Sequence, residues 1–361
     1  MTTALPRLRP LGLGELLDQT IRLYRRNFLK FIGIIALVQI PVSLLQMISS
    51  MVMVSAITPY QNPARPPSDP FEIFGPAYFI GMTGNLIVIA LNFILIQGVA
   101  TAAMTRAVAG SYLGETLSIL DVYRSIGRSW RSLLGALLLV GILGIGLFIW
   151  FIIPCVGWLT GLGIIAFFGM VLVPMIAPII VLEKQPASQS IRRAWDLARR
   201  RFWWVLGFVF VLFLFGQIVV TGPVTVVSVI IQFAFGGPFD LTTTEAVLQT
   251  VIQSLLQLIF AVIYLPLQLT AVTLMYLDLR VRTEGFDLAL QSAMSADQPS
   301  EPLNLMAQAP PAEGTKLVTM TEMGYFVLLS LGAALLYAFF VSIFAGLGLA
   351  ILSASGGPRG F

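Results

Sequence analysis

Residues 190–222 read SIRRAWDLARRRFWWVLGFVFVLFLFGQIVVTG. The first part places arginines and apolar residues at helical spacing, and the part from residue 203 to 222 has no charged residue. A helix needs about 20 predominantly apolar residues to cross the roughly 30 Å hydrocarbon core of a bilayer. The stretch therefore predicts an amphipathic helix that leads directly into a transmembrane helix.

Similar apolar runs recur along the whole chain. Of the 361 residues, 57% are hydrophobic and 11% are charged, whereas an ordinary soluble domain has roughly 25% charged residues. We therefore predict an all-α, polytopic transmembrane helical bundle with seven spans. The predicted spans are residues 31–54, 77–104, 132–154, 157–182, 203–222, 250–276 and 324–353.

The distribution of basic residues predicts how the chain threads through the membrane. If the N-terminus is cytoplasmic, every Lys and Arg lies on the cytoplasmic side except Arg65 and Arg359. Such an excess on one side is typical of cytoplasmic loops. We expect a multi-pass protein of the cell (inner or cytoplasmic) membrane, with an external C-terminus. Its basic inner face should attract anionic lipid headgroups.

An internal repeat accompanies this pattern. An amphipathic helix, called an elbow below, is followed by Arg-x-aromatic and by a glycine at the start of a span. Such helices favour the headgroup layer of a membrane. We predict a six-span core of three elbow-plus-hairpin repeats and a seventh C-terminal span; the alternative is a chance product of basic loops and interfacial aromatic residues. The three matches are Arg26-x-Phe28…Gly33, Arg128-x-Trp130…Gly135 and Arg200-x-Phe202…Gly207.

Composition divides the chain into four segments. Pro154-Cys155-Val156-Gly157 predicts a tight turn between spans three and four, and Pro223 predicts a break after span five. Residues 223–235 either span the membrane or lie at the outer interface. The predicted segments are a cytoplasmic N-terminal amphipathic helix (1–30), a six-span membrane domain (31–290), a disordered cytoplasmic linker (291–321), and a seventh helix with a short external tail (322–361).

The residue types argue against catalysis. Histidine is absent and Cys155 is the only cysteine, so the usual zinc and haem sites are not expected. No ionisable residue falls in the centre of a predicted span, where coupled transporters usually keep one. We expect no enzyme activity, no cofactor and no metal. Amides such as Gln46, Asn85 and Gln253, and prolines such as Pro178 and Pro266, serve either helix packing or the polar path of a carrier.

Basic and aromatic residues near the span ends are the predicted contacts for lipid headgroups or a partner. Arg199, Arg200 and Arg201 beside two tryptophans would also suit nucleic acid, but lipid phosphate is the nearer anion, so no nucleic-acid partner is expected. The seventh helix could pack on its own core or bind a membrane-protein partner. The predicted contact residues are Arg22, Arg26, Arg128, Trp130, Arg192, Arg193, Arg200, Phe202, Trp203, Arg280 and Arg282.

Three segments carry a resemblance to a known family. They are residues 11–18 (LGLGELLD), 190–207 (SIRRAWDLARRRFWWVLG) and 276–288 (YLDLRVRTEGFDL). Together they resemble the family named for the membrane domain of glycerophosphoryl diester phosphodiesterase, over roughly residues 8–290. The resemblance implies a six-span helical domain of largely unassigned role. In the enzymes that lend the name, a separate barrel with carboxylates, histidines and a divalent metal carries the hydrolysis, and that barrel is missing here.

The expected function is therefore that of a non-catalytic integral membrane protein. It would act as a scaffold or accessory subunit that organises lipids or docks membrane partners. The alternative is a transporter or lipid-handling carrier, with a site between the repeats near kinked helices.

Overall fold

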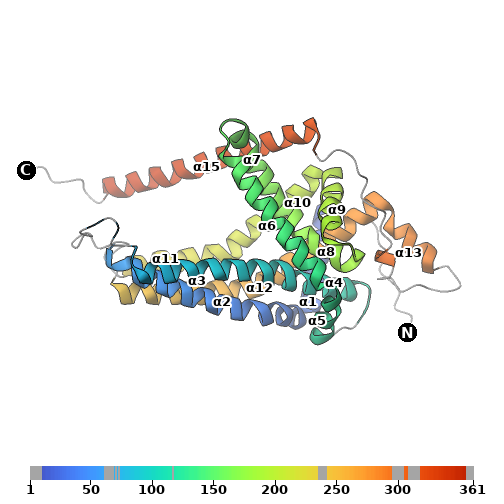
Figure 1. Cartoon of the computed structure of the whole chain (residues 1–361), viewed down its shortest axis with the longest axis horizontal. Helices are drawn as coiled ribbons and strands as arrows, with labels where there is room; N and C mark the ends of the chain where they lie inside the picture. The colour runs from blue at the N-terminus through green and yellow to red at the C-terminus, as the bar shows by residue number, and fades with distance from the viewer. Residues whose placement is uncertain are drawn as a thin grey trace, which may run out of the picture. The chain divides into compact units, whose positions relative to one another are not determined.

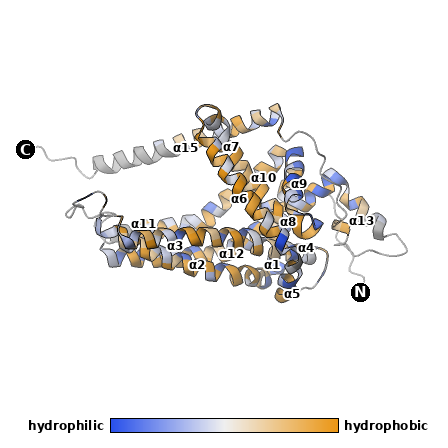
Figure 2. Cartoon of the chain, in the orientation of Figure 1, coloured by the Kyte–Doolittle hydropathy of each residue, from blue (hydrophilic) through white to orange (hydrophobic). Residues whose placement is uncertain are grey.

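The computed structural model describes residues 10–60, 69, 71, 74–115, 118–234, 242–294, 305–307 and 318–354. All regular secondary structure among these residues is helical. Seven of the helices are long and apolar enough to cross a membrane. The predicted all-α class and the seven candidate spans are therefore confirmed (Figure 1). Figure 2 shows hydrophobic residues along most of the coloured length of α2, α6 and α10.

Three of the long helical runs contain a π-helix, and two short 3-10 turns, Thr58–Tyr60 and Gly127–Ser129, adjoin other helices. The described helices are α1 (Leu13–Arg26), α2 (Phe28–Ile57), α3 (Pro76–Asn92), π-helix η2 (Phe93–Ala100), α4 (Thr101–Tyr112), α5 (Ile119–Ile126), α6 (Trp130–Ile152), α7 (Val156–Phe167), π-helix η4 (Phe168–Leu172), α8 (Val173–Glu183), α9 (Ala187–Arg200), α10 (Phe202–Gly216), π-helix η5 (Gln217–Thr221), α11 (Gly222–Ala234), α12 (Thr243–Glu284), α13 (Phe286–Met294) and α15 (Met320–Ala354).

The elbows α1 and α9 end at the arginine of the repeat, and α5 ends at Ile126, just before it. Asn27 alone separates α1 from α2, and Arg201 alone separates α9 from α10. Their ψ angles of 24° and 47° lie outside the helical range, which turns the chain at one residue. Between α5 and α6 the 3-10 turn has the same role. The three following spans begin at the aromatic residues of the repeat, Phe28, Trp130 and Phe202.

The glycines of the first two repeats have equivalent neighbours. A Cβ atom at Gly33 would lie 2.9 Å from Cδ1 of Ile119, the first residue of α5. A Cβ atom at Gly135 would lie 3.3 Å from Cβ of Ala187, the first residue of α9. Each of these glycines thus packs against the first residue of the next elbow. This shared packing favours a structural repeat over a chance pattern. Gly207 has no described atom within 4 Å at the same position.

The second helices of the three repeats form the core. The segments α4, α8 and the C-terminal part of α12 all contact one another. Most residues of α4 and α8 are buried, as are residues 269–281 of α12. Small residues such as Ala102, Ala103 and Ala107 allow α4 to approach its neighbours closely. Both α4 and α8 begin directly after a π-helix.

The expected break at Pro223 is wrong. Helices α10, η5 and α11 form one continuous run from Phe202 to Ala234. A proline lacks the amide proton and its ring crowds the carbonyl group four residues earlier. That carbonyl group lies in η5, where the π-helical hydrogen-bonding pattern accommodates the proline. The structure thus favours a continued span over a separate interfacial segment, while residues 235–241 lie outside the described part.

The predicted linker is ordered at some positions. Helix α13 extends to Met294, and Met306 is fully buried, so the expected disorder is wrong for these residues. Residues 295–304 and 308–317 lie outside the described part, as does the expected external tail from residue 355.

The chain divides into two compact units, which differ from the predicted segments. The first comprises residues 1–138 and 171–312, and the second comprises residues 139–170 and 313–361. The second unit therefore joins the seventh helix, α15, to parts of spans three and four. Within it, Gly163 packs directly on α15, and its amide donates to Oγ of Ser330 at 2.8 Å. The seventh helix thus packs on its own chain.

The turn between α6 and α7 is as tight as predicted. Cys155 takes a left-handed φ of 62°, and α7 begins at the next residue. A Cβ atom at Gly157 would lie 2.1 Å from the carbonyl oxygen of Trp150, so only glycine fits there. One turn later, Gly161 packs against Phe151. The hairpin therefore depends on this pair of glycines.

Candidate functional site

A buried carboxylate at the end of α8 organises the most highly charged part of the interior. Helix α8 stops at Glu183 because Lys184 takes a left-handed φ of 56°. The Glu183 side chain is 0% exposed. Its Oε2 accepts a hydrogen bond from Nε of Arg193 at 3.1 Å, and its Oε1 accepts one from the Tyr276 hydroxyl at 2.6 Å. Nε of Arg280 lies 3.7 Å from Oε1.

Glu284, the last residue of α12, completes the group. Its carboxylate accepts a hydrogen bond from Nε of Arg280 at 3.1 Å and forms an ion pair with Arg193. Glu183, Arg193, Tyr276, Arg280 and Glu284 are called the ion-pair cluster below. It holds two carboxylates and two guanidinium groups, so its formal charge is zero. Buried charges are stable only when paired in this way, and removing one partner is strongly destabilising.

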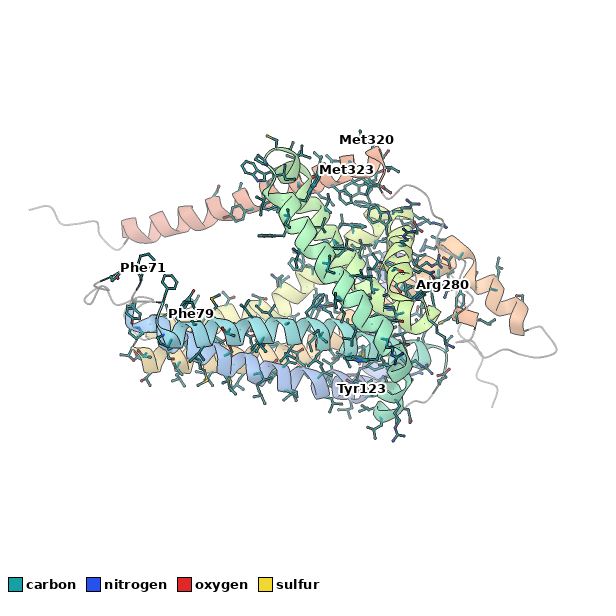
Figure 3. The ribbon with its side chains drawn as sticks, in the orientation of Figure 1. Phe71, Phe79, Tyr123, Arg280, Met320 and Met323 are labelled. Carbon is teal, nitrogen blue, oxygen red and sulfur yellow. The ribbon has the colours of Figure 1, made fainter. Side chains whose placement is uncertain are left out.

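Arg280 connects the cluster to the chain beyond α12. Its Nη1 donates to the carbonyl oxygen of Met306 at 3.0 Å, and its guanidinium lies 4.7 Å from the ring centroid of Phe286. Only 2% of the Arg280 side chain is exposed. Figure 3 shows Arg280 among the packed side chains near α9 and α13. The cluster therefore joins α8, α9, α12, the start of α13 and residues 305–307.

A second pair ties the N-terminal elbow to the end of α12. Asp278 Oδ1 accepts a hydrogen bond from the Leu11 amide at 2.8 Å, and Asp278 Oδ2 accepts one from Nε of Arg282 at 2.6 Å. Arg282 also donates to the Leu11 carbonyl group, and its guanidinium lies 5.5 Å from the ring centroid of Trp204. The adjoining cavity, lined in part by Leu16, has room for about one water molecule. This pair therefore joins the segment before α1 to the end of α12 and the start of α10.

Two tyrosines anchor elbows to neighbouring spans. The Tyr24 hydroxyl donates to the Ile263 carbonyl at 2.7 Å, and the Tyr123 hydroxyl donates to the Ile34 carbonyl at 2.7 Å. Burial raises the pKa of Tyr24 and of Tyr123 to about 12. A raised pKa favours the protonated donor, so this stabilisation is complete below pH 10 and is lost as the pH rises toward 12.

The predicted contact residues differ in how far the structure exposes them. Arg193, Arg280 and Phe202 are buried, so the expectation that they contact headgroups is wrong. Arg282 is largely covered and binds Asp278 and Leu11. The Arg128 side chain lies outside the described part. The exposed members are Arg22, Arg26, Trp130, Arg192, Arg200 and Trp203.

The predicted contact residues include Arg193 and Arg280 but neither glutamate of the cluster. Glu183 is the first charged residue after the apolar run of residues 132–182, and Glu284 follows Arg280 by four residues, the spacing of an ion pair on one helix. These two positions are the signals that could have singled the glutamates out. Arg193 differs from the exposed Arg192 by one position, which is about 100° around a helix. The pairing of Arg193 with either acid depends on packing between separate helices.

Two of the amides inside the spans join neighbouring helices. Gln46 Nε2 donates to Asn85 Oδ1 at 2.9 Å, which joins α2 to α3. Gln253 Nε2 donates to Ser228 Oγ at 2.8 Å, which joins α12 to α11. These contacts support the packing interpretation of the amides over an open polar path.

Replacing Gln46 by Leu should lower the free energy of unfolding by about 0.6 kcal/mol, the average for such interhelical hydrogen bonds. Gln39→Leu is a matched control, because Gln39 donates within its own helix, to Ser43. Unfolding in mixed micelles, followed by tryptophan fluorescence, compares the two variants. Equal losses for both would show that the link between α2 and α3 adds nothing.

Neither the metal-binding residue types nor the comparison with known proteins assigns a function to the chain. Among the described residues, no group of three or more His, Cys, Asp or Glu side chains is placed to hold a metal ion. The chain matches no family model, no curated protein and no solved structure. Its function is therefore argued from its own residues.

Proposed function

We propose that the chain is a non-catalytic scaffold or accessory subunit of the cell membrane that organises anionic lipids around its elbows. The observation that carries the proposal is the mixed exposure of the elbows. On α1 and its junction with α2, Ile21 is 46% exposed and Phe28 is 40% exposed, beside the exposed Arg22 and Arg26. Side chains of both kinds are stable together at the boundary between headgroups and hydrocarbon.

The third elbow repeats this arrangement. Arg192 and Arg200 are exposed on α9, and Trp203 at the start of α10 is 48% exposed. The opposite side of α9 carries Arg193, which the ion-pair cluster holds in place. The cluster thus supports a rigid surface on which the exposed arginines are presented. In this proposal the elbows and the N-terminus face the cytoplasm, as the excess of basic residues favours.

Membrane partners and the family resemblance belong to the same proposal. One side of α15 packs on α7, while Leu328, Leu335 and Tyr337 of α15 are exposed. A membrane-protein partner would bind this exposed side. The resemblance to the phosphodiesterase membrane-domain family is part of the same proposal. It lies in residues 11–18, 190–207 and 276–288, and it supplies no catalytic residue.

Replacing Arg22, Arg26, Arg192 and Arg200 together by Gln should reduce the preference for anionic lipid. Each basic residue near the surface contributes about 1 kcal/mol, so each replacement should weaken the association with anionic lipid about fivefold. Protein purified in mild detergent from mixed phosphatidylglycerol and phosphatidylcholine vesicles is analysed for retained lipid by mass spectrometry. Replacement of the same residues by Lys keeps the charge and should keep the preference. An unchanged lipid ratio in the Gln variant would refute the proposal.

A carrier of lipids is the second candidate, and the π-helices favour it. η2, η4 and η5 interrupt three of the spans, and π-helical turns occur frequently at functional sites. A lipid-handling site would lie between the repeats, near these turns. Proteoliposomes with fluorescent phospholipid distinguish the two functions. Accelerated exchange of that lipid between leaflets would favour the carrier, and a rate equal to that of empty vesicles would favour the scaffold.

A further inference from the structure

Four aromatic side chains gather at the end of α3 that is remote from the elbows. The ring centroids of Phe71 and Phe74 lie 6.3 Å apart, those of Phe74 and Tyr78 lie 5.1 Å apart, and those of Tyr78 and Phe79 lie 5.7 Å apart. The last two pairs are edge-to-face, which aromatic rings favour. Phe71, Phe74, Tyr78 and Phe79 are called the aromatic ladder below.

A backbone hydrogen bond links the first two residues of the ladder. The Phe74 amide donates to the Phe71 carbonyl at 3.0 Å, and α3 begins at Pro76. Proline is well suited to the first turn of a helix because no hydrogen bond is lost there. Behind the ladder, a Cβ atom at Gly81 would lie 2.9 Å from Cα of Met53, so α3 packs closely on α2. Tyr78 and Phe79 therefore lie on a closely packed helix pair, and Phe71 and Phe74 lie shortly before it.

The three phenylalanine rings of the ladder are exposed although they are apolar. Phe71 is 75% exposed and Phe79 is 53% exposed. Figure 3 shows both of them at the same end of α3. The exposed apolar surface continues along the same span through Ile80, Leu86 and Ile87, and residues 74–92 contain no charged residue. The ladder is thus continuous with a surface suited to lipid.

The position of the ladder agrees with a membrane boundary. Helix α2 has 30 residues and carries the chain about 45 Å away from the first elbow. This length exceeds the hydrocarbon core of about 30 Å, so its far end reaches the other headgroup layer. Aromatic residues are enriched in such layers, where a tyrosine hydroxyl can meet polar headgroups.

We propose that the aromatic ladder inserts into the boundary between headgroups and hydrocarbon of the leaflet opposite the elbows. It would anchor the α2–α3 end of the protein there, as the elbows anchor the other end. If the ladder bound another protein, the exposed apolar surface of this chain should end beside the ladder. The exposed apolar residues instead continue along the span, which favours lipid. The anchor does not depend on whether the elbows select anionic lipid.

A fluorescent label tests this placement in the full-length chain. Cys155 is replaced by Ser, Phe71 by Cys, and the new thiol is labelled with a polarity-sensitive dye in phosphatidylcholine vesicles. A nitroxide on the lipid headgroup should quench the dye at least about twofold more than a nitroxide near the end of the acyl chain, as expected at the interface. An Ile87→Cys label in the middle of the span should show the reverse order.

Two outcomes would overturn the proposal. Strong quenching by aqueous iodide without quenching by either nitroxide lipid would place the ladder in water. Protection from both kinds of quencher would show that another protein, or a second copy of this chain, covers it. A Phe74→Cys label repeats the measurement at a second ring if the first variant does not remain monodisperse.

Discussion

Replacing Glu183 by Gln should lower the free energy of unfolding by about 3–5 kcal/mol, because it leaves two guanidinium groups buried with one fewer negative charge. Arg193 and Arg280 would then share the single carboxylate of Glu284. The amide oxygen could still accept the hydrogen bond from Tyr276, but the amide NH2 group cannot accept one from Arg193, so the variant removes that hydrogen bond together with the charge. Unfolding in mixed micelles, followed by tryptophan fluorescence, measures the loss.

Two companion variants separate the cluster from general effects of charge. Asp18→Asn removes an acid that is exposed on α1, so the free energy of unfolding should change by no more than about 0.5 kcal/mol. The double variant Glu183→Met with Arg280→Met removes one charge of each sign and should restore much of the stability, since apolar replacement of a whole buried pair is often neutral. A loss below about 1 kcal/mol for Glu183→Gln would contradict the central position of this carboxylate.

Replacing Gly163 by Ala should separate α15 from α7, at a cost of about 1–3 kcal/mol, which is typical of an overpacked contact. The added Cβ atom would lie 2.2 Å from the Phe326 carbonyl oxygen, a backbone atom that cannot move alone. The hydrogen bond from the Gly163 amide to Ser330 would lengthen as well. The second unit of the fold should therefore lose stability.

Cross-linking reports this separation directly. The rings of Phe167 and Phe326 lie 6.0 Å apart, so cysteines at these two positions should be joined by a short bifunctional thiol reagent in a Cys155→Ser background. Gly163→Ala should reduce the yield severalfold. Gly169→Ala is the matched control in the same span, because nothing lies within 4 Å of a Cβ atom there. Equal yields in the two variants would show that α15 does not need the glycine at residue 163.

The spans and elbows could be predicted from local sequence because hydropathy and helical periodicity are properties of neighbouring residues. Helices α2, α6 and α10 begin at Phe28, Trp130 and Phe202, the aromatic residues of the repeat. The break expected at Pro223 was wrong because a π-helix before the proline accommodates it. Such a change of helical register has no clear local signature in the sequence.

The candidate site could be predicted only in part. The sequence identifies Arg192 and Arg193 equally as basic residues of an amphipathic helix. The structure exposes Arg192 and buries Arg193 between Glu183 and Glu284. These acids lie 10 residues before Arg193 and 91 residues after it in the numbering, on two other helices. No periodicity within one segment can show that three such groups meet.

The sequence by itself determined that this chain is a seven-helix membrane protein with basic elbows, because long apolar runs must leave water and charged residues must remain near it. The tertiary structure alone decided which charges pair in the interior and that the seventh helix packs on α7. The physical reason is that the burial of a charge depends on which helices surround it. That arrangement follows from packing between segments distant in the chain, such as Gly163 against α15 and Glu183 against α9 and α12.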